Sequence, residues 1–270
     1  MPHFSSRHLV LALLLWIVGV FPAAAQSPDG RAILDEVSRR HDTGREFQNL
    51  RMALEEKGGA RSERVLRRYT RQGADGLSRY LLVFDAPSGV RGVALLTWEQ
   101  KGEDDQWLYL PALNSSQLKR IARGGRRNAF MGTDFAFEDL TTEKREAHRY
   151  ERRPDEKWRG HAVFVVEAFP EAHEAATSYE RRRLYVRQDN YMIARIDYFA
   201  QGSGRHIKTM EVEKMEPVTG ERWQATQMVM ETLASGHRTR FETLSRSLAE
   251  GDVPGEVFTH AFIESRRHLR

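Results

Sequence analysis

Apolar and polar residues alternate with a period of two along most of the chain after residue 50, a pattern typical of β-strands. The clearest segments are 80–84, 93–98 and 106–110, and the first is apolar on both of its alternating sides. Glycine-containing turns such as 57–59 and 73–76 separate these segments, so successive strands should pair as antiparallel neighbours. The pattern predicts a meandering sheet of about ten or eleven strands.

One helix is predicted before the first strand. Ser27 or Asp29 can cap its amino end, because a short side-chain oxygen accepts a hydrogen bond from a free backbone N–H group. Gly44 is suited to end it. Three apolar residues share one face of this helix: Ile33, Leu34 and Val37.

Three later segments depart from the alternation. Residues 112–145 form a long mixed segment, 171–183 predict a short helix, and 254–270 predict a strand or short helix that packs on the sheet edge. A large antiparallel sheet with so few helices must curve to protect its inner face. The concave side of such a sheet is expected to be a binding cavity.

The first 25 residues have the features of a secretory signal peptide. Arg7 precedes an unbroken apolar run of 13 residues at 9–21, which is shorter than the roughly 20 residues that span a bilayer. Residues 23–25 are all alanine and predict cleavage after Ala25, with an uncleaved anchor helix as the alternative. We therefore expect a signal peptide at 1–25, one domain at 26–270, and a soluble periplasmic protein.

The composition excludes several kinds of site. The 270 residues include no cysteine, which excludes disulfides, thiolate metal sites, a cysteine nucleophile and a lipid anchor on cysteine. The 42 basic and 38 acidic residues give a net charge of only +4, which does not favour nucleic acid as a partner.

No catalytic motif is present in the sequence, and we expect neither an enzyme nor a cofactor or metal site. The histidines are scattered, so a zinc site would need distant ligands. The segment GTDFAFEDL carries the acidic residues Asp134, Glu138 and Asp139. These could act as an acid–base pair or bind a hard cation, but the favoured interpretation is that they cap a turn and pair with arginines.

A basic run precedes this acidic segment. It could contact nucleic acid, anionic lipid headgroups or an acidic docking surface, or it could pair with Glu138 and Asp139. Aromatic residues follow the run and do not interleave with it, which disfavours nucleic acid. Its members are Lys119, Arg120, Arg123, Arg126 and Arg127.

The segment 98–140 resembles the bacterial outer-membrane lipoprotein-sorting family, the LolA/LolB-like proteins. The matching pieces are WLYLP at 107–111, KRI at 119–121, FMGTDF at 130–135 and EDL at 138–140. The spacing between these pieces also matches, and weaker similarity extends over the rest of the chain. Phe137 departs from the pattern, since the family more often has tyrosine there.

The resemblance implies a half-open antiparallel β-barrel of about eleven strands with a helical lid over an apolar cavity. It further implies a monomeric periplasmic carrier that ferries a lipid or lipoprotein acyl chain towards the outer membrane. Its partners would be an inner-membrane transporter and an outer-membrane acceptor. The alternative is an adaptor that docks to an RND-type lipid exporter without carrying cargo.

The expected site combines apolar and basic residues. Plain core packing is the alternative for each apolar one, because a period of two does not say which face is concave. The residues expected to line the cavity or lid are Trp98, Trp107, Tyr109, Phe130, Phe135 and Met228. Those expected to contact a headgroup or a docking partner are Lys119, Arg120 and Arg123.

Overall fold

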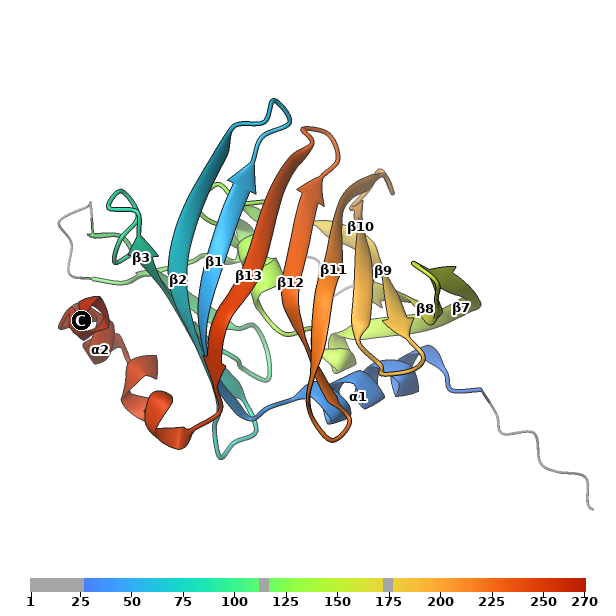
Figure 1. The fold of residues 1–270 in the computed structure, drawn as a ribbon, viewed down its shortest axis with the longest axis horizontal. Helices are drawn as coiled ribbons and strands as arrows, with labels where there is room; N and C mark the ends of the chain where they lie inside the picture. Colours follow the sequence, from blue (N-terminus) through green and yellow to red (C-terminus); the bar gives the residue numbers. More distant parts are fainter. Residues whose placement is uncertain (1–26, 112–116, 172–176) are drawn as a thin grey trace, which may run out of the picture.

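A computed structural model describes residues 27–111, 117–171 and 177–270, so the expected signal peptide lies outside the described residues. Its dominant feature is one curved antiparallel sheet of thirteen strands (Figure 1). The strands are β1 (Arg45–Glu55), β2 (Arg61–Gln72), β3 (Ser78–Ala86), β4 (Ala94–Trp98), β5 (Asp105–Tyr109), β6 (Lys119–Arg120), β7 (His148–Trp158), β8 (His161–Pro170), β9 (Tyr179–Arg187), β10 (Ile193–Ala200), β11 (His206–Thr219), β12 (Arg222–Thr232) and β13 (His237–Ser247).

The sheet consists of two meanders that join in its middle. The strands β1 to β6 follow one another outward on one side, and β13 back to β7 follow on the other. The two meanders meet where β1 pairs with β13, for example at Met52 opposite Phe241. The sheet is open, with β6 and β7 at its two edges. The predicted fold class is confirmed, although the described residues form thirteen strands and the pattern predicted about eleven.

The inner, concave face and the outer face are both apolar in the region of β3 and β4. Leu82, Phe84 and Leu95 point to an inner cluster, whereas Leu81 and Leu96 point to an outer one. This two-sided burial is the reason that the strands read as nearly continuous apolar segments in the sequence.

The carboxyl-terminal residues 253–269, called the C-terminal segment below, cover this outer cluster. They contain the 3₁₀ helices η7 (Gly255–Phe258) and η8 (Arg267–Leu269) around the short helix α2 (His260–Glu264). Val257, Phe258 and Ile263 are at most 3% exposed. The segment was predicted to be a strand or a short helix, and it is helical. It packs on the outer face of the sheet, however, and not on the sheet edge.

Helix α1 (Gly30–His41) lies below the other half of the sheet in Figure 1. The Asp29 carboxylate accepts a hydrogen bond from the backbone N–H of Ala32 at 2.7 Å, so Asp29 is the amino-terminal cap. Ile33 and Leu34 are fully buried against apolar side chains of β8 and β9. In the described part of the chain, no helix has both the length and the apolar character needed to cross a membrane.

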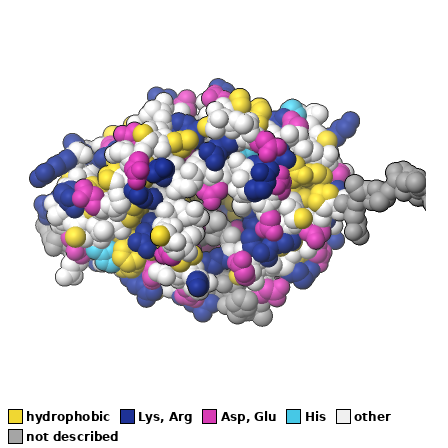
Figure 2. All heavy atoms as spheres, turned by 90° about the horizontal axis from the view of Figure 1, so that it is seen from below, with side chains coloured by type: hydrophobic (Ala, Val, Ile, Leu, Met, Phe, Trp, Pro, Cys, Tyr) yellow, Lys and Arg dark blue, Asp and Glu magenta, His cyan; other side chains and the backbone are white. Residues whose placement is uncertain are grey.

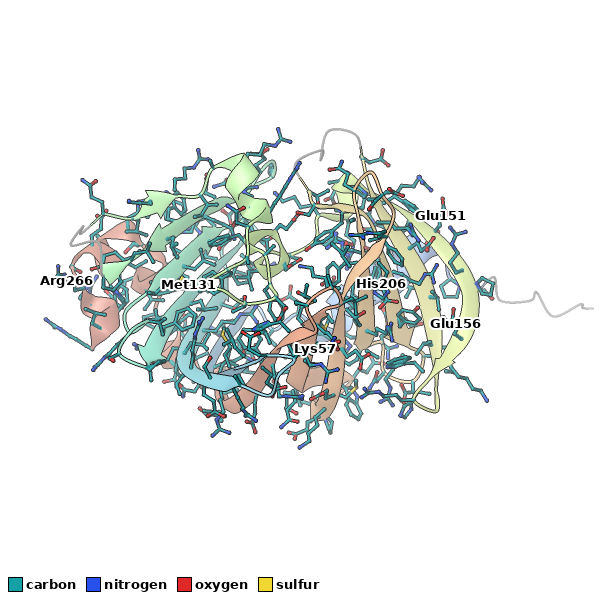
Figure 3. The ribbon with its side chains drawn as sticks, turned by 90° about the horizontal axis from the view of Figure 1, so that it is seen from above. Lys57, Met131, Glu151, Glu156, His206 and Arg266 are labelled. Atoms are coloured by element: carbon teal, nitrogen blue, oxygen red, sulfur yellow. The ribbon has the colours of Figure 1, made fainter. Side chains whose placement is uncertain are left out.

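Residues 121–147, called the lid below, connect the two halves across the concave side. They contain the 3₁₀ helices η2 (Arg123–Arg127), η3 (Phe137–Leu140) and η4 (Arg145–Ala147). Viewed from above, the sheet curves around the lid, whose tip carries Met131 (Figure 3). Phe130 and Phe137 pack edge to face at 5.4 Å and insert into the inner cluster beside Phe84. The lid thereby closes the concave side over β1–β4.

The prediction of a short helix at 171–183 is wrong for the residues that the structure describes. Residues 179–187 form strand β9, and 172–176 lie outside the described residues. The arginines of this segment alternate between the two faces of the sheet: Arg182 points to the lid, whereas Arg181 and Arg183 lie on the outer face beside Glu167.

Candidate functional site

A cavity of about 220 Å³ lies between the lid and the inner face of the sheet. Leucine side chains of β1, β3 and β4 form one wall, and Phe135 with Leu140 contribute from the lid. The apolar lining includes Leu50, Leu82, Leu95, Phe135, Met228 and Phe241. Small-molecule sites usually enclose about 300–1,000 Å³, so a larger occupant requires the lid to move outward.

A buried ion pair anchors the lid to strands β7–β13, called the far half of the sheet below. Lys208 Nζ on β11 donates to Asp139 Oδ2 at 2.5 Å, and both side chains are at most 8% exposed. Asp139 also accepts from the Tyr179 hydroxyl at 2.8 Å and from the Ala136 N–H at 2.7 Å. Burial, reinforced by the Asp139 charge, raises the pKa of Tyr179 far above its ordinary value, so this phenol remains a donor.

A second anchor is Asp134, which docks onto β12 and β13. Its carboxylate accepts from the hydroxyls of Thr232 at 2.5 Å and Thr239 at 2.7 Å, and lies 2.7 Å from His237 Nδ1. Glu138 accepts instead from the Thr177 hydroxyl at 2.7 Å. Asp134, Glu138 and Asp139 therefore bind three different sets of partners, which fits turn capping and anchoring. Among the described residues, no three His, Cys, Asp or Glu side chains are grouped so as to hold a metal ion.

Strands β1–β6, called the near half of the sheet below, hold the lid tip. Arg64 on β2 donates to the backbone oxygen of Met131 at 2.7 Å, and its guanidinium lies 5.7 Å from the centre of the Phe84 ring. Burial lowers the pKa of Arg64 from its ordinary value, but an arginine remains charged at any physiological pH.

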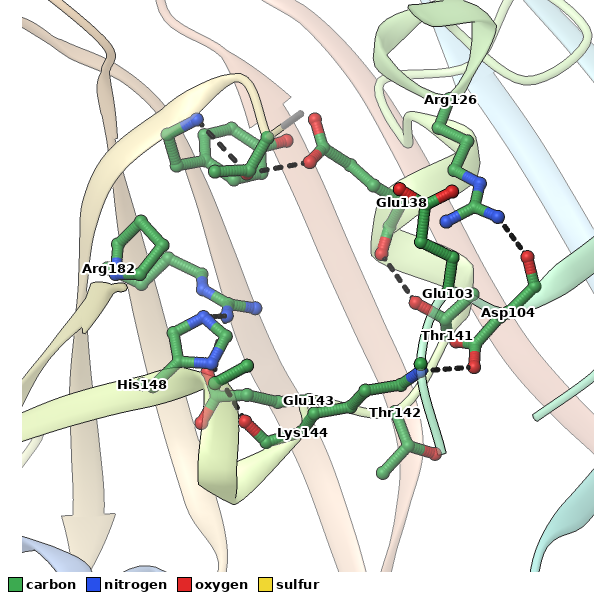
Figure 4. Close-up of a pocket in the computed structure, with 15 residues that line it drawn as sticks. Glu103, Asp104, Arg126, Glu138, Thr141, Thr142, Glu143, Lys144, His148 and Arg182 are labelled. Carbon is green, nitrogen blue, oxygen red and sulfur yellow. Dashed lines mark hydrogen bonds and ion pairs between the residues drawn. The ribbon is translucent and has the colours of Figure 1, made fainter. Parts of the chain in front are cut away.

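A smaller, polar cavity of about 110 Å³ lies on the other side of the lid (Figure 4). Glu143 and Arg182 form its main ion pair at 2.5 Å, and Glu143 also accepts from the Tyr150 hydroxyl at 2.7 Å. Burial alone would raise the pKa of Glu143, but Arg182 and the neighbouring groups lower it below its ordinary value. The His148 ring lies 3.0 Å from the Arg182 guanidinium through Nε2 and 2.9 Å from the Lys144 oxygen through Nδ1.

The structure separates the six residues expected at the cavity. Phe135 and Met228 line it, and Phe130 packs beside it in the inner cluster. The other three lie on the outer face, under the C-terminal segment: Trp98, Trp107 and Tyr109.

Strand parity explains why these three residues do not line the cavity. Leu95 and Thr97 of β4 face the cavity, so Trp98 must face outward. The Trp98 indole N–H donates to the Phe258 oxygen at 2.8 Å, and Tyr109 packs against His268 with 5.1 Å between ring centres.

The basic run lies at the sheet edge formed by β6. Lys119, Arg120 and Arg123 are exposed there. Arg120 pairs with Asp105, and Arg123 pairs with Glu103 at 2.5 Å. The partners of these arginines thus come from the turn before β5 and the start of that strand, and not from Glu138 and Asp139 as one interpretation of the sequence had it.

Polar residues of the cavity were missing from the sequence-based site. Gln48, Arg68 and Tyr80 all line it. Arg68 lies on β2 two positions after Leu66, whose side chain is on the inner face. The alternation therefore places Arg68 on the inner face as well, but this arginine-rich segment was not recognised as a strand.

Comparison with known proteins identifies the same fold elsewhere. A family model described as "Uncharacterized protein" matches residues 76–265. A solved domain from Vibrio parahaemolyticus, assigned as an outer membrane lipoprotein-sorting protein, is 27% identical with a TM-score of 0.80, covering 87% of this chain and 98% of that chain. No curated protein matches the sequence.

Two further structures support the fold. A DUF1329 family protein from Desulfovibrio piger has a TM-score of 0.80 at 24% identity, covering 87% of this chain and 97% of that chain. A LolA superfamily protein from Nitrosomonas europaea has a TM-score of 0.67 at 18% identity, covering 86% of this chain and 98% of that chain. The resemblance found in segment 98–140 is confirmed by these structures, whose fold matches over most of this chain.

Proposed function

Since the chain belongs to the family whose model matches residues 76–265 and has the fold of the lipoprotein-sorting and LolA superfamily proteins, we propose that it is a carrier of lipid or lipoprotein acyl chains. The observation that carries this proposal is the mainly apolar cavity between lid and sheet. An acyl chain gains about 0.8 kcal/mol per buried CH₂ group. A cavity lined by leucine, phenylalanine and methionine offers such burial without covalent chemistry, so no catalytic role is needed.

The proposed setting is the periplasm, reached through cleavage after Ala25. There a monomer would collect its cargo at an inner-membrane transporter and deliver it to an outer-membrane acceptor. The exposed β6 edge, with Lys119, Arg120 and Arg123, is the proposed docking surface for acidic partners or headgroups. Phe135 and Met228 are the proposed contacts of the acyl chain.

Native mass spectrometry of protein purified without detergent tests whether the cavity holds cargo. We expect an added mass that dissociates on activation and corresponds to a lipid. An apo mass, combined with no binding of a fluorescent fatty-acid probe, would contradict the carrier function. A stable crosslinked complex of such an apo protein with a membrane transporter would support the adaptor alternative.

A matched pair of variants on β12 links binding to the cavity. Met228 faces the cavity, whereas its neighbour Val229 is not among the lining residues and faces the outer side of the sheet. Met228→Trp should fill the cavity and reduce binding of the fluorescent probe about tenfold or more, since loss of roughly two buried methylenes suffices for that. Val229→Trp adds the same bulk outside and should leave binding unchanged.

A further inference from the structure

Arg68 in the middle of β2 lines the cavity and has no ionic partner. Among the described residues, no carboxylate lies within ion-pair distance of it and no hydrogen bond engages its guanidinium. Its guanidinium lies 5.8 Å from the centre of the Tyr80 ring. By contrast Arg67, the preceding residue on the outer face, donates from its Nε and one terminal nitrogen to the two carboxylate oxygens of Asp85.

No carboxylate among the described residues pairs with Arg68. Asp139 is the acidic residue among the described lining residues, and Lys208 and Tyr179 occupy its oxygens. Burial, and then the charge of Glu99, raises the pKa of Tyr80 to about 12, so this phenol is neutral. A half-buried guanidinium without an anion is costly, and a bound anion would remove that cost.

Two further polar groups at the cavity lack partners among the described residues. Gln48 lies directly opposite Arg68 in the β1–β2 pairing, is 6% exposed, and forms no side-chain hydrogen bond. The hydroxyl of Thr226 on β12 is buried and likewise has no hydrogen-bond partner. These groups can donate to an oxygen-rich headgroup beside the guanidinium.

The polar groups lie at one end of the cavity. On five strands the lining includes an apolar residue and a polar one two positions away: Leu50 and Gln48, Leu82 and Tyr80, Leu95 and Thr97, Met228 and Thr226, Phe241 and Thr243. Because neighbouring strands run in opposite directions, each of these steps leads toward the same end of the sheet. The cavity is therefore amphipathic, with an apolar end and a polar end.

We infer that the cavity selects an anionic amphiphile, whose carboxylate or phosphate headgroup pairs with Arg68 while its chain lies against the leucine wall. This inference rests on the proposed carrier function and narrows the class of cargo. A guanidinium binds either headgroup through two parallel hydrogen bonds. Gln48 and Thr226 would supply additional donors.

Isothermal titration calorimetry with three ligands of equal chain length tests the inference: dodecanoate, dodecyl phosphate and 1-dodecanol, each below its aggregation concentration. We expect at least one of the anionic ligands to bind about tenfold or more tightly than the alcohol, because a hydrogen-bonded charge pair is worth that much. Preference for dodecanoate alone would indicate fatty acids, and preference for dodecyl phosphate alone would indicate phospholipids.

Variants of β2 assign the preference to Arg68. Arg68→Gln should lower anion affinity to that of the alcohol while alcohol binding stays the same, and Arg68→Lys should keep part of the preference. Arg61→Gln removes an equal charge from an exposed position of the same strand and should keep all of it.

Two results would separate the inference from the function on which it rests. Equal binding of all three ligands, or an unchanged anion-to-alcohol ratio in Arg68→Gln, would overturn the anionic selectivity and leave the carrier intact. Binding of none of the three would contradict the carrier itself. Circular dichroism of each variant shows whether a loss of affinity is caused by unfolding. If Arg68→Gln does not fold, the anion-to-alcohol affinity ratio of Arg68→Lys decides whether the anionic selectivity holds.

Discussion

The two halves of the sheet protect their outer faces in different ways. Over β3–β5 the C-terminal segment buries Leu81, Val83 and Leu96, so that half is a three-layered core of segment, sheet and lid. Over β8–β10 the outer face carries only a small apolar cluster, Val163, Val165 and Tyr185 with Trp158 among the described residues, beside cross-strand pairs such as Arg183 with Glu167 at 2.7 Å. Seen from below, the surface of the molecule likewise has positive and negative side chains interspersed (Figure 2).

The inner faces differ in the same sense. The near half presents leucines to the cavity. The far half presents Lys208 and Arg182, which form ion pairs with Asp139 and Glu143 of the lid. On the near half the lid is thus held mainly by apolar burial, with the Arg64 contact and the ion pair Lys144–Asp104 in addition. On the far half it is held by two ion pairs and by the Asp134 carboxylate. Apolar burial tolerates sliding, but a charge pair is lost as soon as one partner leaves. We therefore expect lid movement to begin at the near half.

The largest effect should come from breaking the charged anchor. Asp139→Asn leaves Lys208 buried without its counter-charge, and removing one partner of such a pair costs about 3–5 kcal/mol. Urea unfolding monitored by circular dichroism measures this loss. The double variant Lys208→Met with Asp139→Leu should recover most of it, because no charge is then buried. A loss below about 1 kcal/mol in Asp139→Asn would show that burial alone holds the lid.

The second effect concerns the covered outer face. Ile263 is fully buried, and Ile263→Ala should cost about 2–5 kcal/mol through lost burial and the cavity that remains. The reference is Val229→Ala on the uncovered outer face, where the half-buried valine should cost about 1 kcal/mol. Equal losses in thermal unfolding would contradict the difference between the halves. Tryptophan fluorescence, to which Trp98 and Trp107 beneath the segment contribute, reports whether the segment detaches.

Sequence reasoning recovered the elements whose residues follow one simple rule. The continuous apolar segments predicted β3, β4 and β5, and the cap at Asp29 was predicted and is confirmed. Strand β2 was missed because both of its faces carry arginine. Arg71 on the outer side donates to the backbone oxygen of Val253, while Arg64 on the inner side holds the lid tip.

The site was predicted less well, for two physical reasons. A period of two shows which residues share a face, but not which face is concave, so Trp98 and Met228 were placed together although they lie on opposite faces. The anchor of the lid joins Asp139 to Lys208, 69 residues away. No local pattern connects such distant positions, whereas Phe135 was found because it lies within the family motif.

A third, pH-dependent effect should separate the inner faces. The pKa of Glu143 is below its ordinary value of 4.5 in the folded protein. Its stabilising contribution is therefore fully present above about pH 4.5 and is lost as the pH falls through the lower folded pKa. Glu143→Gln should be less stable than the natural protein at pH 7, and the difference should narrow as the pH falls from 6 to 3.

Unfolding by urea at several pH values measures this narrowing. Glu264→Gln removes an exposed carboxylate from α2 and should follow the natural protein at every pH. If the free energies of unfolding of Glu143→Gln and the natural protein changed in parallel with pH, the ionised carboxylate would contribute nothing to stability.

The smallest effect is expected on the outer face of the far half. Glu167 is 2% exposed and binds Arg153, Arg181 and Arg183, so Arg183→Ala still leaves the carboxylate with two guanidiniums. Since Arg183 itself is one-third exposed, its removal should cost about 1 kcal/mol or less in urea unfolding. Glu167→Gln would instead leave three arginines facing one another and should cost more. If Arg183→Ala lost as much stability as Ile263→Ala, the outer face of the far half would have to be regarded as a second core held together by charge, and the contrast between the two halves would fail.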